Sequence, residues 1–174
     1  MTAIRLKPEE TRAIAAHLAH FKGYLKTDQF RADQEERQRR VAFFREQLPD
    51  RQPNFSEADL TELVTLLWAT SMWGNKQYHA QQIIAENGID KLRQELQRLF
   101  DPALPAASRY DRFVNSIKHL GPAATTEMLC YACPEDCGIW NTRARQAIEL
   151  LGLSNRVNPK KYRLTAIEYQ TFNK

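Results

Sequence analysis

The sequence predicts an all-α protein folded as a multi-helix bundle. Apolar residues recur at spacings of three and four along most of the 174 residues, which is the period of an amphipathic helix. The chain has only 6 glycines, and its 8 prolines fall mostly between the periodic segments, where they separate helices. It also lacks the alternating runs of β-branched residues that are typical of strands.

The first 52 residues are predicted to form a helical extension of a main domain that covers residues 53–174. An alanine-rich helix is expected from about residue 8 to residue 21. The long polar segment DQFRADQEERQRRVAFFREQL follows, from about residue 27 to residue 48. Because it is charged on every face at its start and becomes amphipathic only near its end, we expect a solvated helix that docks through one end. A basic arm on DNA is the alternative, which the interleaved acidic residues oppose.

The start of the main domain is marked by a change in composition. Residues 49–55, PDRQPNF, contain two prolines and are predicted to be a linker. Ser56 and Asp59 then give a capping signal in front of a helix. The apolar residues of this helix have the spacing of one buried face: Leu60, Leu63, Val64, Leu67 and Trp68.

Further helices are expected along the main domain. One ends at Gly88, because glycine readily takes the left-handed conformation of a C-cap. The next covers residues 89–100, and the turn DPALPAAS separates it from a helix whose apolar stripe begins at Tyr110. A short helix near the end of the chain is capped by Thr165 with Glu168.

Residues 117–129, IKHLGPAATTEML, predict two helices joined by a tight turn at Gly121. Pro122 suits the first position of the second helix. Such a turn leaves main-chain N–H groups unpaired, with the positive end of the helix dipole behind them. This arrangement favours phosphate binding. Taken alone, a Gly-Pro turn is common between helices that bind no ligand. Where such a turn does bind DNA, it contacts the sugar–phosphate strand and not the base edges, so the binding is largely independent of sequence.

Nine residues are predicted to contact DNA around this turn and the helix that follows: Lys118, His119, Gly121, Ala123, Ala124, Thr125, Asn141, Arg143 and Arg145. The small side chains would let a sugar–phosphate strand come close. The two arginines begin a helix, where cations oppose the dipole, so a phosphate partner accounts for their position. Surface arginines without a ligand are the alternative. Asn141 is also interpreted as the N-cap of that helix.

The sequence beyond the turn, CPEDCGIWNTRARQAIELLGL, adds a proline turn and a helix that opens at IWNTR. This order of elements resembles the helix-hairpin-helix DNA glycosylase superfamily over residues 110–153. The resemblance implies a DNA glycosylase-like helical half built from residues 56–153, with Trp140 in its core. The first fifty residues do not share it. Similar stretches accompany bacterial defence and restriction proteins, so a defence or restriction system is the expected context.

The resemblance also identifies missing side chains. Asn141 occupies the position of the superfamily's catalytic aspartate, and a neutral amide does not stabilise a cationic sugar. Ala123 occupies the position of the lysine nucleophile of the lyase members and has no amine. His119 replaces the first glycine of the hairpin. The resemblance therefore implies DNA binding without catalysis, with a partner protein or another domain supplying any enzymatic activity.

Two other functions stay open at this point. An atypical base-excision enzyme would have to use Glu127, Glu135 or Asp136 as its carboxylate. Alternatively, the fold serves as a protein-interaction module that no longer binds DNA.

The three cysteines do not predict a metal centre. They follow the turn as C-x2-C-x3-C, at Cys130, Cys133 and Cys137. Some members of the superfamily carry a four-cysteine iron–sulfur cluster, but the fourth cysteine and its spacing are missing here. Cys130 falls on the inner face of its helix, where cysteine behaves as a small apolar residue. We therefore expect neither a metal nor a cofactor.

Composition favours a cytoplasmic protein, and the charge suits an anionic partner, which the resemblance implies is double-stranded DNA. Ordinary solubilising surface charge is the alternative explanation of the count. The formal net charge is +4, and residues 105–174 hold 10 Lys and Arg against 6 Asp and Glu. The N-terminus lacks the pattern of a signal peptide, and an odd number of cysteines argues against a disulfide framework. No apolar stretch approaches the roughly 18 residues of a membrane span, so no membrane partner is expected.

Overall fold

The computed structural model describes residues 7–174 and contains no strand within that range. This confirms the all-α prediction. Its elements, in chain order, are α1 (Pro8–Tyr24), α2 (Asp28–Ala42), a π-helical stretch (Phe43–Gln47), α3 (Leu48–Arg51), a 3-10 turn (Gln52–Asn54), α4 (Glu57–Leu66), a second 3-10 turn (Trp68–Thr70), α5 (Lys76–Asn87), α6 (Ile89–Phe100), α7 (Ala106–Ser116), α8 (Pro122–Ala132), α9 (Thr142–Leu150) and α10 (Ala166–Phe172).

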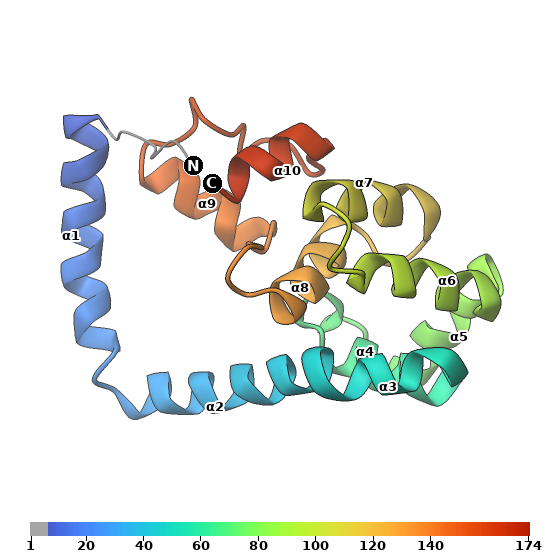
Figure 1. Cartoon of the computed structure of the whole chain (residues 1–174). Helices are drawn as coiled ribbons and strands as arrows, with labels where there is room; N and C mark the ends of the chain where they lie inside the picture. Colours follow the sequence, from blue (N-terminus) through green and yellow to red (C-terminus); the bar gives the residue numbers. More distant parts are fainter. Residues whose placement is uncertain (1–6) are drawn as a thin grey trace.

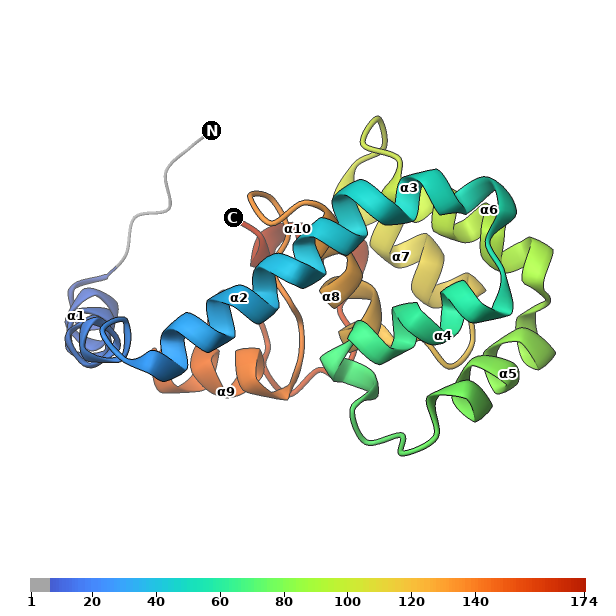
Figure 2. The same cartoon turned by 90° about the horizontal axis from the view of Figure 1, so that it is seen from below.

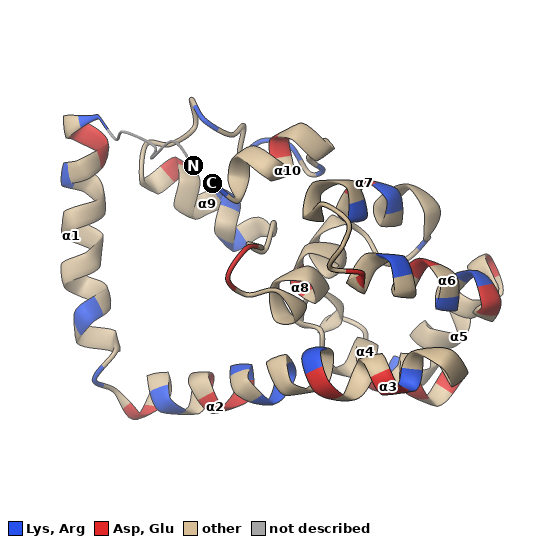
Figure 3. Ribbon diagram, viewed as in Figure 1, with Lys and Arg blue, Asp and Glu red and all other residues tan. Residues whose placement is uncertain are grey.

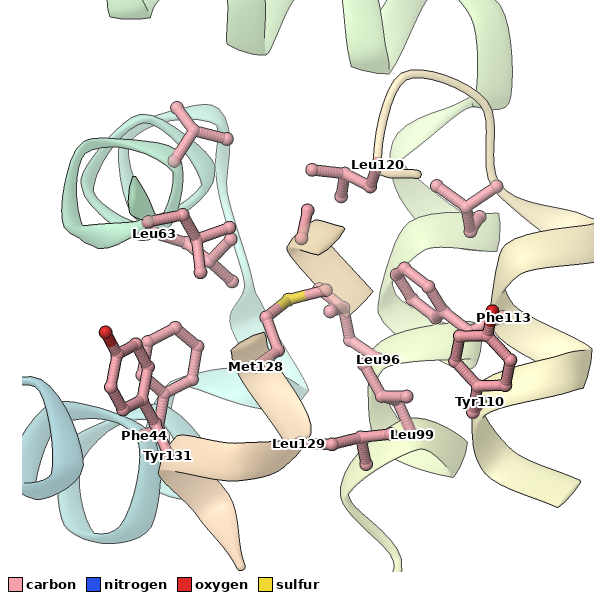
Figure 4. Close-up of a cluster of buried hydrophobic side chains, with 14 of the residues drawn as sticks. Phe44, Leu63, Leu96, Leu99, Tyr110, Phe113, Leu120, Met128, Leu129 and Tyr131 are labelled. Atoms are coloured by element: carbon pink, nitrogen blue, oxygen red, sulfur yellow. The ribbon is translucent and has the colours of Figure 1, made fainter. Parts of the chain in front are cut away.

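Helix α8 lies at the centre of the bundle, with α4, α6 and α7 around it (Figures 1 and 2). Its inner face carries Met128 and Leu129, both fully buried. Figure 4 shows these side chains between Leu63 of α4 and Leu96 of α6, with Phe113 of α7 further out in the same cluster. Such dense apolar packing is the main source of the stability of a small helical domain.

Local capping signals in the sequence are confirmed. Ser56 and Thr165 each form a reciprocal capping box with the acidic residue three positions later. Gly88 ends α5 with a φ of +78°. Trp140 is 1% exposed, so its prediction as a core residue is confirmed as well.

The predicted linker at residues 49–55 is wrong. This segment continues the helical path as α3 and a 3-10 turn, and each of these carries its proline in the first two positions. The missing N–H of proline costs nothing there, so the prolines shape the path without breaking it. Phe55, the last residue of the expected linker, is fully buried.

The N-terminal region divides at the end of α2. Helix α1 turns away sharply from α2 (Figure 1), and Glu10, its one buried residue, pairs with Arg156 at 3.0 Å. Helix α2 has no buried residue, as expected for a solvated helix. By contrast, Phe43, Phe44 and Leu48 are at most 3% exposed and belong to the main core. The docking end of the extension is therefore an integral part of the bundle.

No helix in the described part of the chain combines the length and the apolar character needed to cross a bilayer.

Candidate nucleic-acid interface

The α7–α8 turn, residues 117–121, has a well-defined conformation that Asn87 holds in place. The Asn87 side chain accepts a hydrogen bond from the Lys118 N–H at 2.8 Å and donates one to the Lys118 carbonyl at 3.1 Å. Leu120 is fully buried and anchors the turn in the core. His119 has a φ of +68°, the one positive value among non-glycine residues of the described chain. The backbone at position 119 is thus in the left-handed conformation that glycine adopts most easily, although the residue is histidine.

The strained backbone at His119 gives a first prediction. Replacing His119 by glycine is expected to raise the free energy of unfolding by about 0.5–1 kcal/mol, because a left-handed conformation costs a residue with a Cβ about 1–2 kcal/mol, part of which the extra freedom of unfolded glycine offsets. The measurement is urea denaturation followed by circular dichroism. His119→Ala is the matched control, since it removes the imidazole and keeps the Cβ. A glycine variant no more stable than the alanine variant would contradict the prediction.

The first turn of α8 keeps main-chain donors that no side chain caps. The Thr125 N–H bonds to the Gly121 carbonyl at 3.0 Å and begins the regular helical pattern, so the N–H groups of Ala123 and Ala124 precede it. The side chains of Ala124 and Thr125 are 4% and 0% exposed. They face the core, which corrects the expectation that these two small side chains open the surface to DNA. Ala123 is half-buried, so of the three small residues it is the one whose main chain is left to contact a phosphate.

A cavity of about 610 Å³ lies between the 3-10 turn after α4, the start of α8 and the start of α9. Four of the nine predicted contact residues line it: Ala123, Asn141, Arg143 and Arg145. The other five do not: Lys118, His119, Gly121, Ala124 and Thr125. The other lining residues are Trp68, Ala69, Ser71, Met72, Glu127, Tyr131, Ile139, Trp140, Thr142 and Tyr162.

Asn141 caps α9. Its Oδ1 accepts a hydrogen bond from the Ala144 N–H at 2.9 Å, which confirms the interpretation as an N-cap. Arg145 donates to the hydroxyl of Thr142 at 3.1 Å. The guanidinium of Arg143 lies 5.9 Å from the centre of the Trp68 ring, within the range of a cation–π contact. Lys118 differs from both arginines, because its ammonium pairs with Glu86 at 2.9 Å.

Trp68 is 51% exposed, so its assignment to the buried face of the preceding helix is wrong. Helix α4 ends at Leu66, and Leu67 adopts an extended backbone with a ψ of 125°. This break in the helix moves Trp68 off the apolar face and into the cavity wall. Its ring is contacted by Arg40 of α2, at 5.1 Å, as well as by Arg143.

Glu127 is the charged residue inside the cavity wall that the predicted contact set omitted. It is 2% exposed and accepts hydrogen bonds from the N–H groups of Trp68 at 2.8 Å and Ala69 at 2.9 Å, and from the hydroxyl of Tyr131 at 3.0 Å. Burial raises the pKa of Glu127, and these three hydrogen bonds oppose the rise. Its carboxylate thus ties the 3-10 turn to α8. Its sequence position gives no signal of this role, because the partners lie 58 and 59 residues away.

The other carboxylates considered for catalysis lie outside this cavity. Glu135 is exposed and pairs with Arg45 at 3.3 Å, and Asp136 is exposed in the loop before α9.

The three cysteines are free thiols, and Cys130 and Cys137 are buried. Burial raises the pKa of both, that of Cys137 to about 11, which favours the protonated thiols. Among residues 7–174, no group of three or more His, Cys, Asp or Glu side chains is arranged to hold a metal ion.

The comparison with protein families places the chain in the DNA glycosylase-like class. A family model described as "Putative 8-oxoguanine DNA glycosylase OGG-like protein" matches residues 4–165, and the chain belongs to this family. The match includes most of the first fifty residues, where the sequence alone showed no resemblance. No curated protein and no solved structure matches the chain.

Proposed function

We propose that this protein binds duplex DNA without catalysing base excision and largely without regard to sequence. Main-chain amides at the start of α8 grip a phosphate of the sugar–phosphate strand, and a nucleobase displaced from the duplex occupies the adjacent cavity. One observation carries the proposal: the uncapped start of α8 and the start of α9, with Arg143 and Arg145, meet at the same cavity of about 610 Å³. Membership of a DNA glycosylase-like family supports DNA as the partner.

The charges around the cavity suit a polyanion. Figure 3 shows basic residues at the start of α9. Cations at a helix N-terminus are unfavourable by themselves, so a bound phosphate would stabilise Arg143 and Arg145 there. The apolar part of the wall, with Trp68 and Ile139, suits the flat face of a base.

The side chains that the superfamily uses for chemistry are replaced in this wall. Ala123 has no amine to form a Schiff base, and the amide of Asn141 already caps α9. In this proposal any enzymatic step belongs to a partner protein or to another domain, and a bacterial defence or restriction system is the expected setting. The cytoplasm is the expected location.

Base excision is the second candidate, because Glu127 supplies one carboxylate to the cavity wall. Its two oxygens are engaged by main-chain N–H groups, which favours a structural role. Incubation with a duplex that contains 8-oxoguanine, the base in the family's description, separates the two candidates. Release of the free base by the wild-type protein and its loss in Glu127→Gln would establish excision and overturn the non-catalytic proposal.

Charge reversal at the cavity tests the DNA-binding proposal. The double variant Arg143→Glu, Arg145→Glu is expected to bind a 20-base-pair duplex about 10- to 100-fold more weakly at low salt, since two phosphate contacts become repulsive. Fluorescence anisotropy at several salt concentrations measures both the affinity and its salt dependence, which is expected to become shallower by about two phosphate contacts.

The matched control is Arg31→Glu, Arg39→Glu, which makes the same charge change on exposed α2 residues. It is expected to change the affinity far less than the cavity variant. An equal loss in both variants would favour α2 as a basic arm. No binding of the wild-type protein at low salt would overturn the proposal and leave the protein-interaction module.

A further inference from the structure

Arg109 of α7 is a buried cation without a carboxylate partner in the described part of the chain. It is 6% exposed, and none of the ion pairs among residues 7–174 includes it. Its Nη1 donates to the Leu99 carbonyl at the end of α6, at 2.9 Å, and its Nε has no hydrogen-bond partner among the same residues. Because a buried charge is costly unless an opposite charge lies beside it, the position of this guanidinium indicates a neighbouring anion.

The neighbour on the remaining side of the guanidinium is a thiol. Nη2 of Arg109 lies 3.9 Å from the Sγ of Cys133, the C-cap residue of α8. Cys133 is half-buried, whereas Cys130 and Cys137 are buried. A partly exposed thiol beside an arginine is typical of reactive cysteines, because the cation stabilises the thiolate, which is the nucleophile. Cys133 is therefore the thiol of the three that is placed to react.

Cys137 is held next to Cys133 by a closed turn of the α8–α9 loop. The N–H groups of Asp136 and Cys137 donate to the Cys133 carbonyl at 3.1 and 3.0 Å. A hydrogen bond between residues four apart brings their Cα atoms to about 6 Å, and a disulfide joins Cα atoms that are about 4.4–6.8 Å apart. Burial, and with it the charge of Cys133, raises the pKa of Cys137. The two thiols are thus spaced for a bond between them.

We propose that Arg109 activates Cys133 for oxidation by peroxide and that Cys137 completes a reversible disulfide. The Cys133 thiolate attacks one oxygen of hydrogen peroxide, the O–O bond breaks, and the departing hydroxide takes up a proton to give water. The product is a sulfenic acid at Cys133. The sulfur of Cys137 then attacks that of Cys133, and the hydroxyl of the sulfenic acid leaves with the thiol proton as a second water. The two thiols lose two electrons, which reduce the peroxide to water.

This oxidation site is separate from the proposed DNA contacts, although it borders on the cavity. None of its three residues lines the cavity wall. The loop continues from Cys137 directly into Ile139 and Trp140, which do line it. The hydroxyl of Tyr169 donates to the Gly138 carbonyl at 3.1 Å and ties this part of the loop to α10. Oxidation is therefore expected of the α8–α9 loop whether or not the cavity binds DNA.

The test exposes the folded wild-type chain to hydrogen peroxide, alkylates the remaining thiols and identifies the products by mass spectrometry. Cleavage after Tyr131 by chymotrypsin separates Cys130 from the other two cysteines. The expected product is a peptide about 2 Da lighter, with a bond between Cys133 and Cys137 that dithiothreitol reverses, while Cys130 stays free. Cys137→Ser is expected to stop at a sulfenic acid about 16 Da heavier, which dimedone traps, and Cys133→Ser is expected to remain reduced.

Arg109→Met removes the charge at nearly constant length and is expected to slow disulfide formation about tenfold, whereas Arg109→Lys is expected to retain most of the rate. Circular dichroism checks that each variant is folded, and the cysteine variants decide the outcome by themselves if the Arg109 variants do not fold. Cys130→Ser is the matched control and is expected to oxidise as the wild type does. A disulfide that includes Cys130, equal reaction of all three thiols, or an unchanged rate in folded Arg109→Met would overturn the proposal.

Discussion

Replacing Glu127 by alanine is expected to lower the free energy of unfolding by about 3 kcal/mol. The substitution removes the acceptor of the N–H groups of Trp68 and Ala69 and of the Tyr131 hydroxyl. A buried donor that loses its partner costs about 1–3 kcal/mol. The alanine variant also avoids the desolvation cost of burying a carboxylate, which keeps the expected loss well below the sum over three donors. Urea denaturation of the whole chain measures the change.

The comparison with Glu135→Ala isolates the effect of burial. Glu135 lies in the loop between α8 and α9, with a side chain that is 67% exposed and pairs with Arg45. An exposed ion pair contributes at most about 1 kcal/mol, so this variant is expected to unfold close to the wild type. Glu127→Gln keeps one carbonyl oxygen and replaces the other with a donor, and it should fall between the two alanine variants. Equal stability of both alanine variants would show that the carboxylate does not hold the cavity wall.

The difference between these two glutamates also explains which parts of the site the sequence could predict. The cap at Asn141 depends on an N–H three residues away, so it is visible in a short sequence window. The turn at His119 is also held by Asn87, 31 residues away, which no short window shows. Glu127 and Trp68 lie in the cavity wall because of a hydrogen bond between residues 59 positions apart in the sequence. No local pattern encodes that pairing, and helical spacing alone placed Trp68 in the core.

The fold, like the site, was predictable where it depends on local sequence signals. Helix positions follow from apolar spacing and from capping residues, which act within one or two turns. The prolines at 49 and 53 suggested a linker because a sequence pattern does not distinguish a proline that ends a helix from one that begins the next turn. The structure resolves this ambiguity through Phe55, whose burial requires the chain to turn back onto the bundle.

The second large effect is expected from Phe44→Ala, which should lower the free energy of unfolding by about 3–5 kcal/mol. Phe44 is 1% exposed. Its ring stacks on that of Tyr131 in α8 with 5.5 Å between centroids, and it meets the edge of the Phe43 ring at 5.2 Å. Loss of a buried phenylalanine removes its transfer free energy and leaves a cavity that neighbouring side chains fill only in part. Thermal and urea denaturation both measure the change.

Phe21→Ala in α1 is the matched control, because Phe21 is 47% exposed and does not belong to the main core cluster. This variant is expected to change stability by less than about 1 kcal/mol. The pair of variants thus tests where the extension ends and the core begins. If Phe44→Ala lowers the free energy of unfolding as little as Phe21→Ala does, the predicted boundary between the extension and the main domain at residue 52 is correct. A large difference would place the boundary near the end of α2, since the Phe43, Phe44 and Leu48 side chains complete the surface against which α8 packs.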